Sequence, residues 1–383
     1  MDIRGTTIAC ASRKKKNNVE RENEIVKTIK YLEEYLDSNN NSDKDKELKD
    51  YRNSLENLRA EKMKGIMLRS KAKWCEEGEK PTRYFCSLEK RNYICKLVNK
   101  LNCNGTIIHS QDQILEKQQS FYKTLYSSKI GTNTENLLNE FLHENNIKQL
   151  SDEQKDICDG PIRKDEIKEV IRNIANNKTP GSDGFPVEFW KFFWINIGHF
   201  LIRALDEAFE NGELSFTQKQ GVITCLHKDN KPREFLKNWR PISLLNTDYK
   251  ILTGILARRL KLILPSIIGQ TQKGFLKERF IGENTRLVYD IMDYLNSNNM
   301  AGMLLLVDFE KAFDTLEWSY IKAVLNKYNF GNTFTRWFDI IYKNSNSCVI
   351  NNGKISESFE LKAGGVARGI LYHRICLFLP LNH

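Results

Sequence analysis

The first part of the chain alternates apolar and polar positions at helical spacing. Ile25, Ile29 and Leu32 fall on one face of a helix. After a polar interruption, a second segment has a seam of Leu48, Tyr51, Leu55 and Leu58. Residues three, four or seven positions apart lie above one another on a helix, so the pattern predicts two paired helices. We therefore expect a helical hairpin with a coiled-coil-like seam over residues 21–65, preceded by a disordered basic lead-in over residues 1–20.

Helical spacing returns further along the chain. The pattern predicts helices over Gln111–Tyr126, Lys164–Asn176, Pro186–Gly212 and Asp248–Leu264. The third is rich in aromatic residues, for which core packing is the favoured interpretation and a stacking surface is the alternative. In the fourth, Leu252, Leu256 and Leu260 face inward and leave Arg258 and Lys261 on the outer face.

Other segments have the character of β-strands. Gly221–Lys228 is a β-type run that ends in a polar turn, and Met303–Val307 is a nearly uninterrupted apolar run of the kind found in a buried strand. Asn352 and Gly353 lie between β-type runs and predict a hairpin turn. Together with the helices, these strands predict an α+β fold.

Asp308 directly follows the predicted strand Met303–Val307. An ionised carboxylate at the rim of a buried sheet is costly unless it is hydrogen-bonded, paired or bound to a metal. Because Mg²⁺ takes one or two carboxylates together with substrate phosphates, Asp308 is a candidate metal ligand. A helix cap or a salt bridge is the alternative. Asp314, three residues before Glu317, fits a capping box instead.

The overall composition narrows the class of protein. The 383 residues carry a net charge of +10 with a pI near 9.0, a balance that favours a polyanionic partner such as nucleic acid. No apolar run reaches the roughly 18 residues of a membrane span. Nine cysteines without a C-x-x-C pair indicate reduced thiols rather than a zinc site. Reduced thiols predict an intracellular protein, either nuclear or cytoplasmic.

Isolated cations and glycines complete the candidate chemistry. Lys228 at a strand end can reach a phosphate, and Arg240 in NWRPISL offers a planar fork suited to bidentate phosphate contact. In NNKTPGSDG, Lys178 accompanies Gly181 and Gly184, where a backbone can approach a nucleic-acid strand closely. Taken singly, such cations are ordinary surface residues and such glycines an ordinary turn.

The run RKKK, Arg13–Lys16, has three interpretations. It is a nuclear localisation signal, a nucleic-acid contact or a solvated basic flank. The solvated basic flank is the favoured interpretation.

Four longer stretches share their order with a known family. They are NNKTPGSDGFPVEFW, HKDN…NWRPISLLNTDYKILTGILARRL, QTQKGFLKERFIGENTRLV and LLLVDFEKAFDTLEW. In sequence and in succession they resemble the reverse transcriptase domain of non-LTR retrotransposons of the long interspersed element type. MLRSKAKWCEEGEKPTRYFCSLEKRN resembles the region just upstream of that domain, so the resemblance runs from about Lys64 to Phe378.

The resemblance implies an RNA-directed DNA polymerase with a right-hand fold of fingers and palm. Asp308 matches the palm carboxylate that binds Mg²⁺ or Mn²⁺, and Phe313 matches the bulky residue that excludes a ribose 2′-hydroxyl. Lys228 and Arg240 match the fingers cations that hold the incoming deoxynucleoside triphosphate, and Gly369 belongs to a motif that lines the nucleotide pocket. The implied partners are an RNA template and a DNA primer. The residues assigned to their contacts are Lys178, Gly181, Gly184, Arg258 and Lys261.

The sequence departs from the family near its end. In GGVARGILYHRICLF, Arg368 replaces a glutamine of the family motif, and both prolines are lost. No residue after Glu360 is acidic, so the sequence supplies no second palm carboxylate for a two-metal mechanism. We therefore expect an incomplete palm sheet, no thumb and a polymerase fragment that is inactive by itself. A non-catalytic RNA- or DNA-binding remnant and a helical interaction protein are the alternatives.

The expected domain order follows from these assignments. After the basic lead-in and the hairpin we expect a helical connector over residues 66–160. Fingers follow over residues 161–300, and a partial palm over residues 301–383. The hairpin also offers a weak route to coiled-coil self-association.

Overall fold

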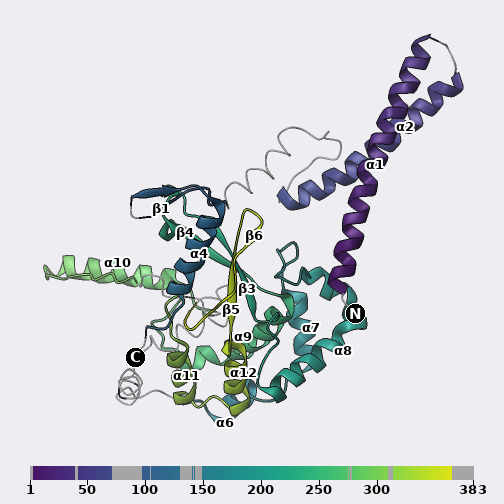
Figure 1. The fold of residues 1–383 in the computed structure, drawn as a ribbon. Helices are drawn as coiled ribbons and strands as arrows, with labels where there is room; N and C mark the ends of the chain where they lie inside the picture. Colours follow the sequence, from purple (N-terminus) through teal and green to yellow (C-terminus); the bar gives the residue numbers. More distant parts are fainter. Residues whose placement is uncertain are drawn as a thin grey trace. The chain divides into compact units, whose positions relative to one another are not determined.

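The chain forms two compact units in a computed structural model, Met1–Leu97 and Val98–His383 (Figure 1). The structure describes residues 3–38, 42–70, 97–103, 105–129, 140, 142, 149–274, 276, 278–308 and 314–364. Phe313 and Gly369 lie outside these residues, as does most of the segment expected just upstream of the polymerase region. The unit boundary at Leu97 differs from the boundaries that the sequence predicts at residues 65 and 160.

The first unit contains two long helices, α1 (Ile3–Ser38) and α2 (Ser42–Ser70). They pack side by side and bury Ile25, Leu32 and Leu48 of the predicted seam. The other seam residues, Ile29, Tyr51, Leu55 and Leu58, are half-buried. The expectation of a disordered lead-in is corrected, because α1 already begins at Ile3. Lys, Arg and Ala are good helix formers, and residues 3–20 contain no proline to stop the helix.

Ion pairs between the two helices define an antiparallel hairpin. Arg52 bonds Glu33 at 2.6 Å, while Arg59 and Lys62 lie 3.6 and 3.4 Å from Glu22. Later residues of α2 therefore lie beside earlier residues of α1. The side chains in these pairs are mostly exposed, so the pairs set the register more than they stabilise the hairpin.

A five-stranded sheet organises the second unit. Its strands run in the order β4-β3-β5-β6, and β7 pairs with β5. Their bounds are β3 Gln220–His227, β4 Trp239–Leu244, β5 Asn346–Asn351, β6 Lys354–Ile355 and β7 Phe359–Glu360. β3 and β4 are antiparallel, whereas β3 and β5 are parallel, so the chain between β3 and β5 must cross over. The predicted turn at Asn352 and Gly353 joins β5 to β6, with φ of +52° and +76°.

Helices surround this sheet. They are α4 Gln111–Leu125, α6 Asp152–Cys158, α7 Lys164–Asn173, α8 Val187–Asn211, α9 Thr247–Ile267, α10 Gly282–Ser297, α11 Trp318–Lys327 and α12 Asn332–Tyr342. A short pair of strands, β1 Leu101–Cys103 and β2 Thr106–Ile108, precedes α4. The expected helical connector therefore includes a β-hairpin. None of the described helices is long and apolar enough to cross a membrane.

Helix α9 is the centre of the core. Leu252, Leu256 and Leu260 are fully buried, as their spacing predicts. α9 packs against α6, α7 and α8, which explains why most of its faces are apolar. Its position fixes the loops on either side of it, including the end of β4.

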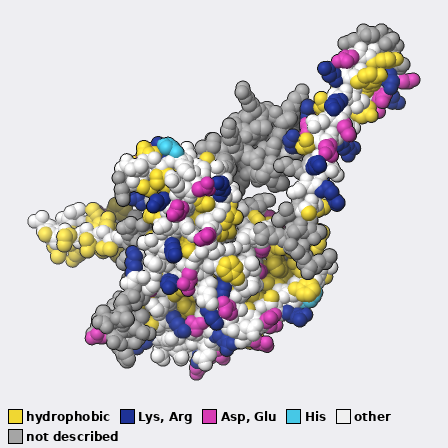
Figure 2. All heavy atoms as spheres, viewed as in Figure 1, with side chains coloured by type: hydrophobic (Ala, Val, Ile, Leu, Met, Phe, Trp, Pro, Cys, Tyr) yellow, Lys and Arg dark blue, Asp and Glu magenta, His cyan; other side chains and the backbone are white. Residues whose placement is uncertain are grey.

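The expected strand Met303–Val307 is not formed. These five residues lie in an irregular exposed segment, with Met303 94% and Leu306 83% exposed. A strand is stabilised by pairing with a neighbour, and no described strand lies beside this segment. None of the 16 residues of the preceding helix α10 is buried, and its hydrophobic side chains stand at the surface in Figure 2.

The aromatic helix α8 is only partly a core element. Trp190 and Trp194 pack against the core, as expected. Phe193 and Phe200 are 39% and 58% exposed, so core packing does not account for them. α8 ends at Gly212, whose φ of +68° forms the left-handed cap that glycine favours.

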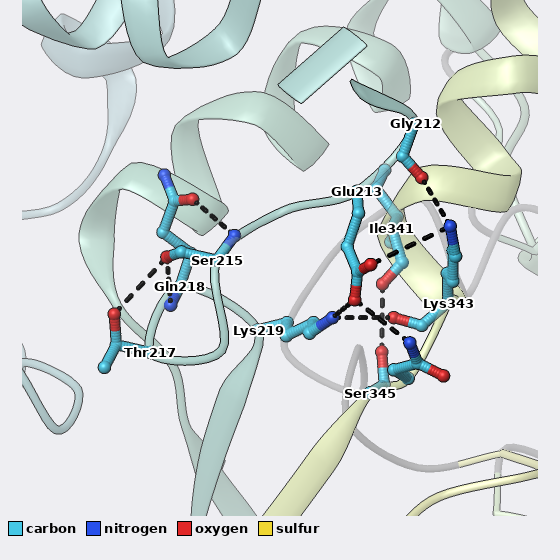
Figure 3. A network of polar contacts seen from close by, with 10 residues as sticks. Gly212, Glu213, Ser215, Thr217, Gln218, Lys219, Ile341, Lys343 and Ser345 are labelled. Carbon is cyan, nitrogen blue, oxygen red and sulfur yellow. Dashed lines mark hydrogen bonds and ion pairs between the residues drawn. The ribbon is translucent and has the colours of Figure 1, made fainter. Parts of the chain in front are cut away.

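A polar network holds the start of β3 against the start of β5 (Figure 3). The buried ammonium of Lys219 bonds the Glu213 carboxylate and the carbonyl oxygen of Lys343. Glu213 also accepts a hydrogen bond from Asn344 at 3.0 Å. These bonds tie the end of α8 to the α12–β5 turn, and so fix where the β3–β4 hairpin stands.

Candidate nucleotide-binding site

The β3–β4 hairpin positions the two cations that the sequence analysis singles out. Leu226 pairs with Arg240 and His227 with Trp239, so Lys228 follows directly at the end of β3. The backbone N–H of Lys228 donates to the carbonyl of Asn238 at 2.9 Å, which extends the hairpin beyond its named strands. Lys228 and Arg240 are thus held near one another on facing strands.

Side-chain bonds make the turn between these strands rigid. The indole N–H of Trp239 donates to the carbonyl of Arg233 at 2.8 Å, and the amide of Asn238 donates to the carbonyl of Pro232 at 2.8 Å. The Lys228 ammonium donates to the carbonyl of Lys237 at 2.9 Å. A site built on such a hairpin presents its cations in a fixed geometry.

A small pocket of about 40 Å³ opens beside this hairpin. Its lining residues are Phe121, Tyr122, Leu125, Lys228, Leu236, Lys237, Trp239, Arg240, Pro241 and Asp314. Helix α4 supplies an aromatic wall and the hairpin supplies three cations. The pocket therefore combines an apolar wall with a positive rim that suits phosphate oxygens.

Lys237 is the cation in this pocket that the sequence analysis missed. It lies in the short 3-10 turn Leu236–Asn238, where nothing in its spacing sets it apart from other exposed lysines. Its ammonium lies 5.7 Å from the centre of the Phe235 ring. Only the folded hairpin reveals that it shares a pocket with Lys228 and Arg240.

The acidic residue that lines the pocket is Asp314, which is 2% exposed. The expected capping role is wrong, because α11 begins at Trp318 with Glu317 as its N-cap residue. Gly364 packs against Asp314: a Cβ atom built on Gly364 would lie 2.0 Å from the Asp314 carbonyl oxygen. The N–H of Gly364 also donates to the carbonyl of Leu316 at 2.8 Å. The start of the glycine-rich motif is therefore joined directly to the segment that follows Asp308.

The wall of the pocket on the α4 side is chemically inert. The Tyr122 hydroxyl lies 3.3 Å from the sulfur of Cys225, and the Gln118 amide donates to the same sulfur at 3.6 Å. Burial raises the pKa of Cys225 to about 11 and also raises the pKa of Tyr122. Both groups stay protonated at neutral pH, so this wall offers shape rather than a nucleophile.

Asp308, the predicted metal ligand, ends the exposed segment 301–308. Residues 309–313 lie outside the described part of the chain. Among the residues that the structure describes, no group of three or more His, Cys, Asp or Glu side chains is placed to hold a metal ion. The described residues therefore do not fit a complete Mg²⁺ site, and metal binding at Asp308 stays a prediction.

The glycine loop near Lys178 has an internal role. A Cβ atom on Gly181 would lie 2.0 Å from the side-chain oxygen of Asn246, so only glycine fits there. Asn246 accepts from the N–H of Asp183 at 3.2 Å and donates to the carbonyl of Thr217 at 2.7 Å. Gly184 is exposed with φ of +77°, and Lys178 is exposed. At Gly181 the close backbone approach is made to Asn246, the residue before α9, and contact with a nucleic-acid strand stays a prediction.

Helix α9 carries two cations near its surface and a third that is buried. Lys261 is exposed, and Arg258 is half-buried in an ion pair with Glu169. Arg259, between them, is 5% exposed by side chain and forms a bidentate pair with Glu166, both bonds 2.7 Å. The spacing of hydrophobic residues gives no sign of this buried arginine.

Comparison with known proteins bears directly on this region. Residues 226–376 match the family model described as reverse transcriptase (RNA-dependent DNA polymerase), a stretch that begins at the end of β3 and includes the pocket cations. The chain carries a reverse transcriptase domain. The resemblance to non-LTR retrotransposon proteins is thereby confirmed, and the helices and mixed sheet agree with the α+β fold class.

Three relatives place this domain among transposon proteins. The chain is 30% identical over 314 residues to the Transposon TX1 uncharacterized 149 kDa protein of Xenopus laevis, covering 81% of this chain and 24% of that protein. It is 27% identical over 157 residues to the Probable RNA-directed DNA polymerase from transposon BS of Drosophila melanogaster, covering 40% and 17%. It is 26% identical over 180 residues to the Retrovirus-related Pol polyprotein from type-1 retrotransposable element R1 of Bradysia coprophila, covering 46% and 17%. The chain spans a quarter or less of the length of these relatives.

Proposed function

We propose that the pocket beside the β3–β4 hairpin binds the triphosphate of an incoming deoxynucleotide during RNA-directed DNA synthesis. One observation carries the proposal: Lys228, Lys237 and Arg240 line a single pocket together with the buried Asp314. The pocket lies within the residues that match the reverse transcriptase family. A triphosphate has enough negative charge to engage all three cations.

The three cations have complementary chemistry. Arg240 has a planar guanidinium that matches two phosphate oxygens at once. Lys228 and Lys237 act as point charges that adapt to the remaining oxygens. Lys228 has its ammonium anchored at 2.9 Å to a backbone carbonyl, so its position costs little further ordering when a ligand binds.

The remaining site residues belong to the same proposal. Reverse transcriptases use divalent metal ions, and Asp308 is the residue proposed to bind one, either Mg²⁺ or Mn²⁺. Phe313 is proposed to exclude a ribose 2′-hydroxyl, and Gly369 to line the nucleotide pocket. An RNA template and a DNA primer are the proposed partners. Their proposed contacts are Lys178, Gly181, Gly184, Arg258 and Lys261.

The proposed domain organisation follows the family. Fingers over residues 161–300 would carry the β3–β4 hairpin, and a palm over residues 301–383 would carry Asp308. The contact between Gly364 and Asp314 supports this organisation, because it joins the two palm motifs of the resemblance. Both motifs would then move together with the pocket.

Nucleotide binding tests the proposal without requiring catalysis. Titration of fluorescent dATP should show weaker binding for Lys228→Ala and for Arg240→Ala, each by about tenfold or more, since hydrogen bonds to charged groups contribute about 1.5–3 kcal/mol. Lys231→Ala is the matched control, because Lys231 is exposed in the same turn but does not line the pocket. Equal binding by all four proteins would refute the proposal.

A second candidate function is favoured by charge. The chain has a net charge of +10, and Lys178 and Lys261 are exposed. We therefore propose that the chain binds an RNA–DNA duplex through phosphate contacts. Duplex binding that weakens steeply with salt checks this, because phosphate contacts release counterions, and absent or salt-insensitive binding would contradict it.

A further inference from the structure

We propose that the basic end of the α1–α2 hairpin is a second nucleic-acid-binding surface, which contacts the phosphate backbone without reading sequence. The inference concerns only the first unit of the chain. It does not depend on the nucleotide pocket, and the two proposals can fail separately.

The charges of the hairpin are sorted by sign along its length. Ile3–Val19 of α1 contains five basic residues and no acidic residue. Asn57–Ser70 of α2 contains four basic residues and one acidic residue. At the other end, Tyr31–Ser38 contains three acidic residues and no basic one, and Ser42–Asp50 has four acidic residues against three basic ones.

The ion pairs orient the two basic segments toward the same end of the hairpin. Because Lys62 and Arg59 pair with Glu22, the helices are antiparallel, and Figure 1 shows them diverging beyond these pairs. By sequence, Ile3–Val19 and Asn57–Ser70 together have an excess of eight positive charges. Tyr31–Ser38 and Ser42–Asp50, at the opposite end, have an excess of four negative charges.

This surface differs from an ordinary solvated helix face. On such a face, charges of opposite sign alternate and support one another at i,i+4 positions. Arg13, Lys14 and Lys16 are exposed neighbours of like sign, and Lys16 has a single acidic neighbour, Glu20, at 3.9 Å. Like charges this close destabilise a helix, and a bound polyanion relieves that repulsion.

The size of the basic segment fits a nucleic-acid backbone. The 17 residues Ile3–Val19 form a helix about 25 Å long. Duplex DNA has one phosphate per roughly 1.7 Å of its axis, so a helix of this length meets several phosphates on the side it faces. The excess of basic side chains favours contact with phosphates, which carries no sequence information, so we infer backbone contact.

Two triple variants of the full chain test the proposal. The first replaces Arg13, Lys14 and Lys16 by alanine at the basic end. The second replaces Lys44, Lys46 and Lys49 by alanine at the acidic end and serves as the matched control. Both remove three positive charges from the same hairpin, and circular dichroism checks that each keeps its helix content.

Fluorescence anisotropy with a mixed-sequence 20-base-pair DNA duplex, at several KCl concentrations, gives the readout. For the basic-end variant we expect at least tenfold weaker binding. The slope of log affinity against log salt should be shallower by about 2–3, because each lost phosphate contact reduces that slope by about 0.9. The control should stay within about twofold of wild type.

Three outcomes overturn the proposal. Equal losses in both variants would indicate a net-charge effect, and no loss in either would remove the surface from binding altogether. Binding of wild type to phosphatidylserine vesicles but not to the duplex would assign the surface to membranes. The basic-end variant should leave dATP binding unchanged, so a failure of this proposal is distinguishable from a failure of the nucleotide pocket.

Discussion

Gly364 lies directly against the backbone of Asp314, with the position of a Gly364 Cβ only 2.0 Å from the Asp314 carbonyl oxygen. Gly364 also has φ of +57°, a conformation that disfavours side chains. The contact joins the beginning of the glycine-rich motif to the pocket that contains Lys228 and Arg240. A side chain at position 364 must therefore displace one wall of the pocket.

The first prediction concerns this contact. Gly364→Ala should lower the free energy of unfolding by about 3 kcal/mol, of which a left-handed conformation accounts for about 1–2 kcal/mol. Gly353→Ala is the control, because Gly353 has φ of +76° but no atom within 4 Å of its Cβ position. Urea unfolding should show the larger loss at position 364. Equal losses would mean that the contact with Asp314 is unimportant.

The second prediction compares two neighbouring arginines on α9. Arg259 bonds Glu166 and also donates to the carbonyl oxygens of Cys158 at 3.1 Å, Gly160 at 2.9 Å and Pro161 at 2.7 Å. Arg259→Lys cannot replace this planar set of donors and should cost about 2–4 kcal/mol of stability.

Arg258→Lys is the matched control for this change. Its partner Glu169 is 48% exposed, so the loss should stay below about 1 kcal/mol. Thermal and urea unfolding of both variants provide the measurement. A similar cost at positions 258 and 259 would contradict the anchoring role of Arg259.

The third prediction concerns Asp248 at the start of α9. Burial, together with the nearby charge of Asp183, raises the pKa of Asp248 from 3.8 to about 6. A carboxyl group whose pKa rises on folding stabilises the folded state fully below pH 3.8, and this contribution is lost as pH rises to about 6. Asp248→Asn keeps an amide oxygen for the Tyr249 N–H but does not titrate.

The difference in unfolding free energy between wild type and Asp248→Asn isolates this effect. It should move in favour of the variant by about 2 kcal/mol between pH 4 and pH 7, and stay constant above pH 7. Urea unfolding at several pH values supplies the curve. A difference that does not change with pH would show that Asp248 titrates normally.

Much of the fold follows from local patterns in the sequence. Helix α9 and strand β3 occur where the spacing of apolar residues predicts them, and Asn352 and Gly353 form the predicted turn. Each of these depends on residues close together in the chain. Their conformation is therefore encoded locally.

Features that depend on distant partners were not predictable in the same way. Met303–Val307 has the composition of a buried strand, yet a strand needs a neighbour, and none of the described strands lies beside it. Arg259 is buried because Glu166 and three carbonyls lie around it, and all of them come from segments about 100 residues earlier. Nothing in the local sequence shows these partners.

The residues of the candidate site also fall into those that a local motif predicts and those that only folding brings together. The resemblance to reverse transcriptases predicted Lys228 and Arg240, because each lies in a recognisable motif. Lys237 and Tyr122 join the pocket only through the folding of the hairpin against α4. Asp314 was assigned to a helix cap because its spacing from Glu317 fits one, although the helix begins later, at Trp318.

The most direct test of the account asks whether the pocket recognises phosphates. Calorimetric titration of the wild-type chain should show affinity rising from dAMP through dADP to dATP, because each added phosphate meets another cation of the pocket. In the Lys228→Ala/Arg240→Ala double variant this preference should largely disappear. If dATP and dAMP bind wild type equally, or if the double variant keeps the full preference for dATP, the pocket does not hold a triphosphate.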